Sequence, residues 1–226
     1  MEIQIEDITI EIEWKKIKNL HLRVYPPHGD VRITAPMRLG LDPVRQFALS
    51  KLEWIRKHKK KIAERGQAAP CRFISGESHY YRGECYMLEL IEMDAKPQVE
   101  IEDGTLKLYV RPGADEEKRK AVMDDFYRYQ LRQILPDIIS KWEKEMKVRV
   151  SEFGIKKMKT KWGTCNRKAR RIWINLELAK KPPQCLEYIV VHELAHLLER
   201  YHNSVFYGYM DKFLPQWHTY KKILNS

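Results

Sequence analysis

His192, Glu193 and His196 form a His-Glu-x-x-His sequence, in which two imidazoles are four residues apart. On an α-helix this spacing places both rings on one face, about 40° apart, so that two nitrogens can meet at one metal ion. Glu193 lies beside the first histidine and can hydrogen-bond a water on that metal without being a ligand. Zinc lowers the pKa of such a water toward about 7, so a carboxylate can accept its proton at neutral pH. The motif therefore predicts a zinc site that performs hydrolysis.

A tetrahedral zinc needs a third protein ligand, and three side chains after the motif are candidates: Glu199, His202 and Asp211. Glu199 lies on the face of His192 but about 10 Å farther along a straight helix, too far to share one ion. His202 can reach the metal if the helix ends near Arg200–Tyr201 and the chain turns back. Asn203 tolerates the left-handed backbone conformation that could make this turn. We favour His202 over Glu199, and Asp211 is the more remote option.

The four cysteines, Cys71, Cys85, Cys165 and Cys185, are scattered and form no Cys-x-x-Cys pair. Neither a disulfide framework nor a cysteine zinc knuckle is therefore predicted. A structural zinc site fills all four positions with protein atoms, and no cysteine is close to the motif, which favours an open position for water. The alternative is a zinc-stabilised binding module without turnover.

The motif must lie on a helix that is buried on one side. An apolar stripe at helical spacing supports this: Leu186, Ile189, Val190, Leu194 and Leu197. The sequence Lys180-Lys181-Pro182-Pro183 ends the preceding strand and opens this helix. Alternating patterns predict strands over 148–160 and 172–176, and the strand that holds Trp173 and Asn175 is a candidate edge for an extended peptide.

The remaining chain suggests two parts that divide near Pro112. Alternating apolar residues predict mostly strands over 1–112, with one helix at about 42–63 that begins at Asp42-Pro43. Residues 114–146 have helical periodicity with an interruption near Pro136. We therefore expect a β-rich N-terminal region, 1–112, and an α+β domain, 113–226, that carries the chemistry.

The net charge of +11 is concentrated in one segment. Residues 141–181 hold fourteen Lys or Arg against four Asp or Glu, an excess of ten positive charges. Such a segment can attract nucleic acid or an acidic protein surface, or it can be a solvated face. No apolar run approaches the roughly 18 residues of a membrane-spanning helix, and the acidic start does not look like a targeting segment. We expect a soluble, cytoplasmic protein without membrane association.

Several motifs in order resemble the YgjP-like metallopeptidases, relatives of the SprT-like and wider zincin peptidases. They are Lys161-Trp162-Gly163-Thr164-Cys165, Ile174-Asn175-Leu176, the 188–197 segment around His-Glu-x-x-His, His202-Asn203-Ser204 with Phe206, and Leu214-Pro215. The resemblance implies a zincin-like α+β fold, Zn²⁺ held by His192, His196 and His202, and Glu193 as general base. It implies a peptidase that acts on peptide or protein substrates.

The chain departs from the related families in two places, and two further hypotheses concern the oxyanion and the substrate. The family commonly has Phe-Trp where this chain has Phe206-Tyr207, which we expect to alter packing near the site. Metzincins have glycine where Glu199 stands, so the chain is not a metzincin. Tyr207 and Tyr209 are candidates to steady an oxyanion. Because SprT-like relatives act on proteins attached to DNA, a DNA-associated protease that uses the basic 141–181 segment is a second hypothesis.

Overall fold

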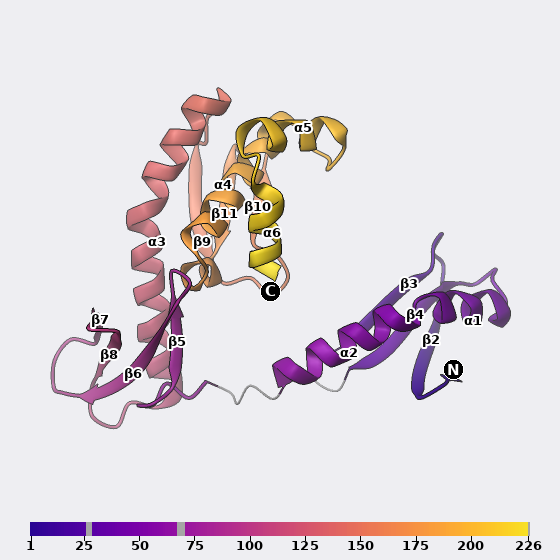
Figure 1. Ribbon diagram of the computed structural model, residues 1–226, viewed down its shortest axis with the longest axis horizontal. Coiled ribbons are helices and arrows are strands. Elements are labelled where there is room, and N and C mark those ends of the chain that lie inside the picture. The colour runs from indigo at the N-terminus through magenta and orange to yellow at the C-terminus, as the bar shows by residue number, and fades with distance from the viewer. Residues whose placement is uncertain (26–28, 67–70, 226) are drawn as a thin grey trace. The chain divides into compact units, whose positions relative to one another are not determined.

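The computed structural model describes the backbone of residues 1–25, 29–66 and 71–225, and the side chains of these residues except 61–66. The chain forms two compact units, Met1–Cys71 and Arg72–Ser226 (Figure 1). Each unit has its own hydrophobic core. The mixed α+β architecture predicted from the sequence is confirmed.

The first unit is a four-stranded sheet with two helices. Its strands are β1 (Glu2–Ile5), β2 (Ile8–Lys15), β3 (His21–Tyr25) and β4 (Asp30–Pro36), in the order β1-β2-β4-β3 with β2 and β4 parallel. Ile8, Ile10 and Ile12 are buried and alternate with exposed residues, as the period-two pattern predicted. The sequence predicted one helix over 42–63, whereas the structure has α1 (Leu41–Ser50) and α2 (Leu52–Gly66). The Ser50 hydroxyl donates to the carbonyl of Phe47 and competes with the helical hydrogen bonds there.

The second unit begins with another four-stranded sheet. Its strands are β5 (Ser78–Tyr81), β6 (Glu84–Glu92), β7 (Gln98–Glu102) and β8 (Thr105–Val110), in the order β5-β6-β8-β7 with β6 and β8 parallel. Leu88 and Leu108 of this sheet belong to the same core as Met123 and Leu131 of the long helix α3 (Glu116–Met146). The division at Cys71–Arg72 therefore differs from the one predicted at residue 112, because strands β5–β8 pack on the helix that follows them.

Helix α3 continues through Pro136, where the sequence predicted an interruption. Its buried residues on either side of the proline, Leu131, Leu135, Ile139 and Trp142, are spaced by three or four. This regular stripe packs into the core on both sides of the proline, and the packing outweighs the lost hydrogen bond.

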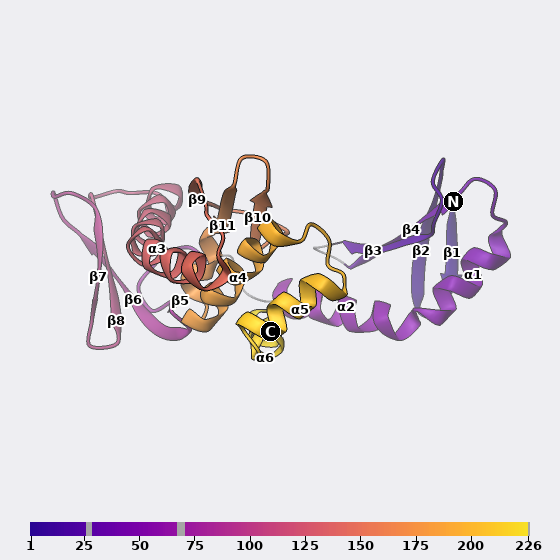
Figure 2. The same ribbon diagram turned by 90° about the horizontal axis from the view of Figure 1, so that it is seen from above.

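A three-stranded sheet and three helices complete the second unit. They are β9 (Glu152–Lys156), β10 (Gly163–Asn166), β11 (Arg171–Asn175), the 3₁₀ turn η1 (Leu176–Lys180), α4 (Pro183–Leu198), α5 (Ser204–Phe213) and α6 (Trp217–Asn225). The strand order is β10-β11-β9, with β10 antiparallel and β9 parallel to β11. Helix α4 packs against α3, α5, α6 and strands β10 and β11 (Figures 1 and 2). Of the helices described, none combines the length and the apolar character needed to cross a membrane.

Candidate metal centre

Helix α4 holds His192 and His196 on one face, with ring centroids 5.0 Å apart. Pro183 occupies its first turn, where the missing N–H of proline costs no hydrogen bond. Val190 and Leu194 have no exposed surface, and most of the helix circumference is packed against neighbouring elements. The core therefore fixes the direction in which the two imidazoles point.

The chain turns back after α4 and brings His202 to the other two histidines. The His202 ring centroid lies 4.9 Å from that of His192 and 4.7 Å from that of His196. Glu199 caps α4 in an extended conformation, and Asn203 begins α5 by accepting a hydrogen bond from Phe206 N at 3.0 Å. Asn203 does not adopt the left-handed conformation that could have made this turn. Its φ of −100° and ψ of −175° are those of an N-cap residue.

Phe206 forms a platform beneath the three imidazoles. Its buried ring lies 5.0 Å from that of His192 and 4.7 Å from those of His196 and His202, centroid to centroid. An apolar wall of this kind limits the positions that the three rings can take. The sequence marked Phe206 only as part of a family motif and gave no sign of this contact.

The three histidines could hold a metal, because ligand atoms of all three lie within 4.8 Å of one another. His192 Nε2 and His202 Nε2 are 3.0 Å apart, and nitrogens bound to one tetrahedral zinc are about 3.3 Å apart. His196 Nδ1 donates to the carbonyl of Glu199 at 3.2 Å, which leaves the Nε2 lone pair available. In the part of the chain that is described, no fourth protein donor joins this group.

The two other candidates for the third ligand, Glu199 and Asp211, accept hydrogen bonds from other residues. Glu199 Oε1 accepts from the backbone N–H of Tyr201 at 3.0 Å. Asp211 Oδ1 accepts from the indole N–H of Trp217 at 2.8 Å. The arrangement thus favours His202, which lies beside His192 and His196, as the third ligand.

The environment of His192 and His196 favours the neutral imidazole, the form that binds metals. Burial, first, and then the neighbouring His196 and His202 together lower the pKa of His192 to about 3. Burial also lowers the pKa of His196, although its hydrogen bond to Glu199 opposes the shift. Protons are therefore poor competitors for the nitrogens of His192 and His196 near neutral pH.

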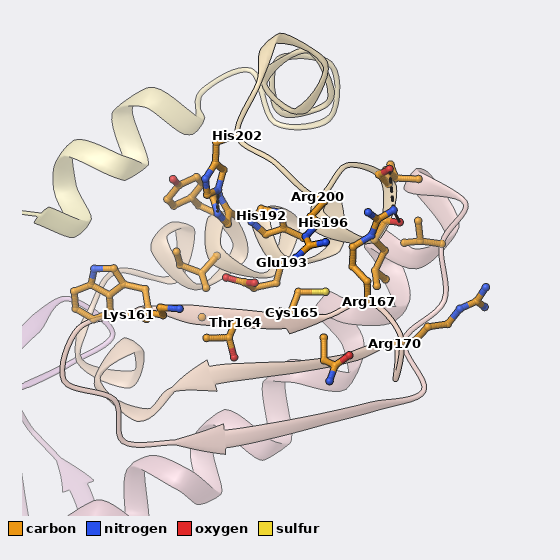
Figure 3. A pocket seen from close by; sticks show the side chains of 18 of the residues that line it. Lys161, Thr164, Cys165, Arg167, Arg170, His192, Glu193, His196, Arg200 and His202 are labelled. Carbon is orange, nitrogen blue, oxygen red and sulfur yellow. Dashed lines mark hydrogen bonds between the residues drawn. The ribbon is translucent and has the colours of Figure 1, made fainter. Parts of the chain in front are cut away.

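Glu193 is 4% exposed and points from α4 toward strand β10 (Figure 3). A Cβ added to Gly163 would lie 2.6 Å from Glu193 Oε1, so any other residue there would force the Glu193 side chain to move. Burial raises the pKa of Glu193 to about 8, and the nearby Lys161 opposes the shift. A metal cation beside the carboxyl group would act in the direction of Lys161 and favour the ionised form. Glu193 makes no hydrogen bond to any described residue, so its oxygens are available to a ligand in the cleft.

A cleft of about 1430 Å³ opens over these residues. It is lined by His192, Glu193, His196 and His202, and also by residues 161–168 of β10 and its flanks. Tyr188 contributes to its wall, and burial raises the pKa of this phenol to about 12.

The two tyrosines proposed as oxyanion donors do not line the cleft in the described structure. Tyr207 stacks between His202 and Trp217, with ring centroids 6.3 and 5.4 Å away. Tyr209 stacks on Phe213. The cleft instead presents cationic side chains such as Arg167 and Arg200, for which the sequence carried no local signal of a site role (Figure 3).

The sheet has two edge strands, β9 and β10, and β10 is the one that lines the cleft. The sequence pattern had suggested the strand that holds Trp173 and Asn175 as the edge for a peptide. That strand, β11, is paired on both sides and cannot accept a peptide. The buried amide of Asn175 instead fixes the loop before β10, because its Nδ2 donates to the carbonyls of Met158 at 2.9 Å and Lys161 at 2.7 Å. Alternation along a strand reveals its faces but not its place in the sheet.

A family model described as "YgjP-like, metallopeptidase domain" matches residues 18–226. Two solved zymogens of metallopeptidases are similar over part of the chain. Abylysin of Pyrococcus abyssi has 22% identity and a TM-score of 0.36, and the alignment covers 40% of this chain and 88% of abylysin. Jannalysin of Methanocaldococcus jannaschii has the same identity and TM-score, and the alignment covers 40% of this chain and 93% of jannalysin. No curated protein matches the chain.

Proposed function

The chain belongs to the YgjP-like metallopeptidase family, as its motifs predicted, and from this premise we propose that it is a zinc-dependent peptidase. In this proposal His192, His196 and His202 bind the metal, and Glu193 is the general base. The observation that carries the proposal is the convergence of three imidazoles within 4.8 Å on the wall of a cleft that Glu193 also lines.

Zinc fits this donor set better than a hard cation such as Mg²⁺ or Ca²⁺ does. Imidazole nitrogens in a tetrahedral arrangement are typical zinc ligands, whereas Mg²⁺ and Ca²⁺ prefer oxygen donors. Three protein donors, rather than four, favour a catalytic site over the zinc-stabilised binding module. When bound, zinc supplies a Lewis acid that polarises a peptide carbonyl and lowers the pKa of a water toward about 7.

The residues of the chain would move the proton and hold the substrate. Glu193 accepts a proton from the attacking water on a carboxylate oxygen and donates it to the leaving amine nitrogen. Its position beside β10 puts this carboxylate close to the strand edge at which an extended peptide can add a strand. The cationic side chains of the cleft wall, Arg167 among them, can balance negative charge that develops on the carbonyl oxygen.

Substitutions at the site test the proposal through two readouts, zinc content and cleavage of a fluorogenic peptide library. Glu193→Gln should retain zinc and lose activity by roughly 10²- to 10⁴-fold, the usual contribution of general base catalysis. His192→Ala and His202→Ala should lose both. His21→Ala, which changes an exposed histidine of the first unit, is the control and should change neither. Full cleavage by Glu193→Gln would contradict the proposal.

A further inference from the structure

The cleft over the metal centre carries a large excess of positive charge. Among the residues that the structure describes, eight Lys or Arg side chains line it, against one carboxylate, that of Glu193. Six of them come from three neighbouring segments of the second unit: Lys147, Arg149, Arg167, Lys168, Arg170 and Arg200. The other two are Lys161, before β10, and Lys221 of α6.

None of these eight cations has a carboxylate within ion-pair distance among the residues described, and all eight are exposed. Their neighbours outside the cleft differ in this respect. Lys157 pairs with Asp124, Arg171 with Glu152, and Lys180 with Glu177. Of the eight cations of the 141–181 segment that lie outside the cleft, four are paired with a carboxylate, whereas none of the six that line the cleft is paired with a described carboxylate. Charges of one sign in a cleft focus the potential there and attract ligands of the opposite sign.

The cations flank the proposed metal site on two sides. Figure 3 shows Arg167, Arg170 and Arg200 on the side of His196, and Lys161 on the opposite side of Glu193. Arg167 Nη2 donates to the carbonyls of Leu197 and Leu198 at 3.4 and 3.5 Å, which holds its guanidinium at the C-terminal end of α4. The denser group lies at the β10–β11 turn, where an extended chain along the free edge of β10 would pass.

We propose that the substrate is an acidic peptide segment, whose carboxylate side chains lie near the scissile bond and bind Arg167, Lys168 and Arg170. This inference rests on the proposed peptidase function and names the substrate class for the same site. Because the cations surround the proposed catalytic residues, the anion that they bind is the molecule placed for hydrolysis.

The cleft is poorly suited to the other common polyanion, a single-stranded nucleic acid. Proteins that bind such strands stack bases on aromatic side chains. The aromatic residues of this cleft, Trp162 and Tyr188, are half-buried and buried, and both pack into the hydrophobic core. The cleft therefore offers positive charge and a strand edge but little stacking surface.

The test is a binding experiment on the zinc-loaded Glu193→Gln protein, which separates recognition from turnover. Three fluorescein-labelled probes are compared at low salt: an Ala/Leu peptide with four Glu, the same peptide with four Gln, and a thymidine oligonucleotide. The Glu peptide should bind about tenfold more tightly than the Gln peptide, and its affinity should fall as the salt concentration rises. Equal affinity for the two peptides would overturn the inference, and so would tighter binding of the oligonucleotide.

Two double variants test whether the preference for the Glu peptide comes from the cations of the cleft. Lys168→Gln with Arg170→Gln removes two cations of the cleft that make no side-chain hydrogen bond to a described residue. It should weaken binding of the Glu peptide about tenfold and leave the Gln peptide unchanged. Lys156→Gln with Lys159→Gln removes two exposed cations of the same segment that lie outside the cleft, and it should change neither affinity. Equal losses in both double variants would overturn the proposal. Failure of the wild-type protein to cleave any peptide would count against the peptidase function. The binding experiments would still decide whether the cleft recognises acidic peptides.

Discussion

Gly163 lies directly against the carboxylate of Glu193, with no room for a side chain between strand β10 and helix α4. A Cβ at this position would lie 2.6 Å from Oε1, 2.8 Å from Cγ and 2.9 Å from Cδ of Glu193. The glycine thus determines where the proposed general base can sit.

Gly163→Ala should displace Glu193 and lower kcat/KM by about a hundredfold, because a misplacement of about 1 Å is enough for such a loss. Zinc content should be unchanged, and overpacking should cost about 1–3 kcal/mol of stability. Gly208→Ala is the control, since nothing lies within 4 Å of its Cβ position. Full activity in Gly163→Ala would show that catalysis does not depend on the exact position of Glu193.

Phe206→Leu should weaken zinc binding by about 10- to 100-fold, the range seen when groups that support metal ligands are removed. Leucine keeps the site apolar but removes the ring that contacts all three imidazoles. Competition with a chromophoric chelator measures the affinity. Phe213→Leu, in the same helix but stacked on Tyr209, should leave zinc affinity intact. Equal zinc affinities of the two variants would show that the Phe206 ring does not support the three imidazoles.

Asn175→Ala should destabilise the protein by about 2–4 kcal/mol, because four hydrogen bonds end on this buried amide. Urea unfolding followed by tryptophan fluorescence provides the measurement. Asn166→Ala loses a single exposed hydrogen bond, to the N–H of Ala169, and should cost about 1 kcal/mol or less. A similar cost for both substitutions would mean that the loop before β10 does not depend on Asn175.

Cys165 should react slowly with iodoacetamide although it lines the cleft. Burial first, and then the negative charge of Glu193, raise the pKa of this thiol to about 11. Because only the thiolate reacts, and two pKa units separate this value from the ordinary 9.0, the rate at pH 8 should be about a hundredfold lower than that of an ordinary thiol. The rate should rise with pH toward 11. Exposed Cys85 is the internal reference, read by mass spectrometry, and equal rates at pH 8 would contradict the assignment.

Local patterns predicted much of this structure. The alternation from Ile8 to Ile12 gave a strand, the Pro182-Pro183 pair gave the start of α4, and the histidine spacing gave the group that the fold assembles. In each case the signal lies within a few residues, as a helical or strand period or as a proline at the start of a helix.

The features that the sequence did not predict depend on tertiary contacts. Gly163 resembles any loop glycine until α4 is packed beside it, and the free edge of β10 is a property of the whole sheet. The boundary at Cys71 follows from the packing of β5–β8 on α3, which no local pattern contains. The cationic cleft shows the same limit, because the sequence located the basic segment but not which of its charges remain unpaired.

X-ray absorption at the zinc edge of the loaded protein tests the central claim most directly. We predict three imidazole nitrogens at about 2.0–2.1 Å and one oxygen donor from solvent, and the loss of one imidazole in His202→Ala. A shell of four protein donors, or a shell unchanged in His202→Ala, would contradict the account.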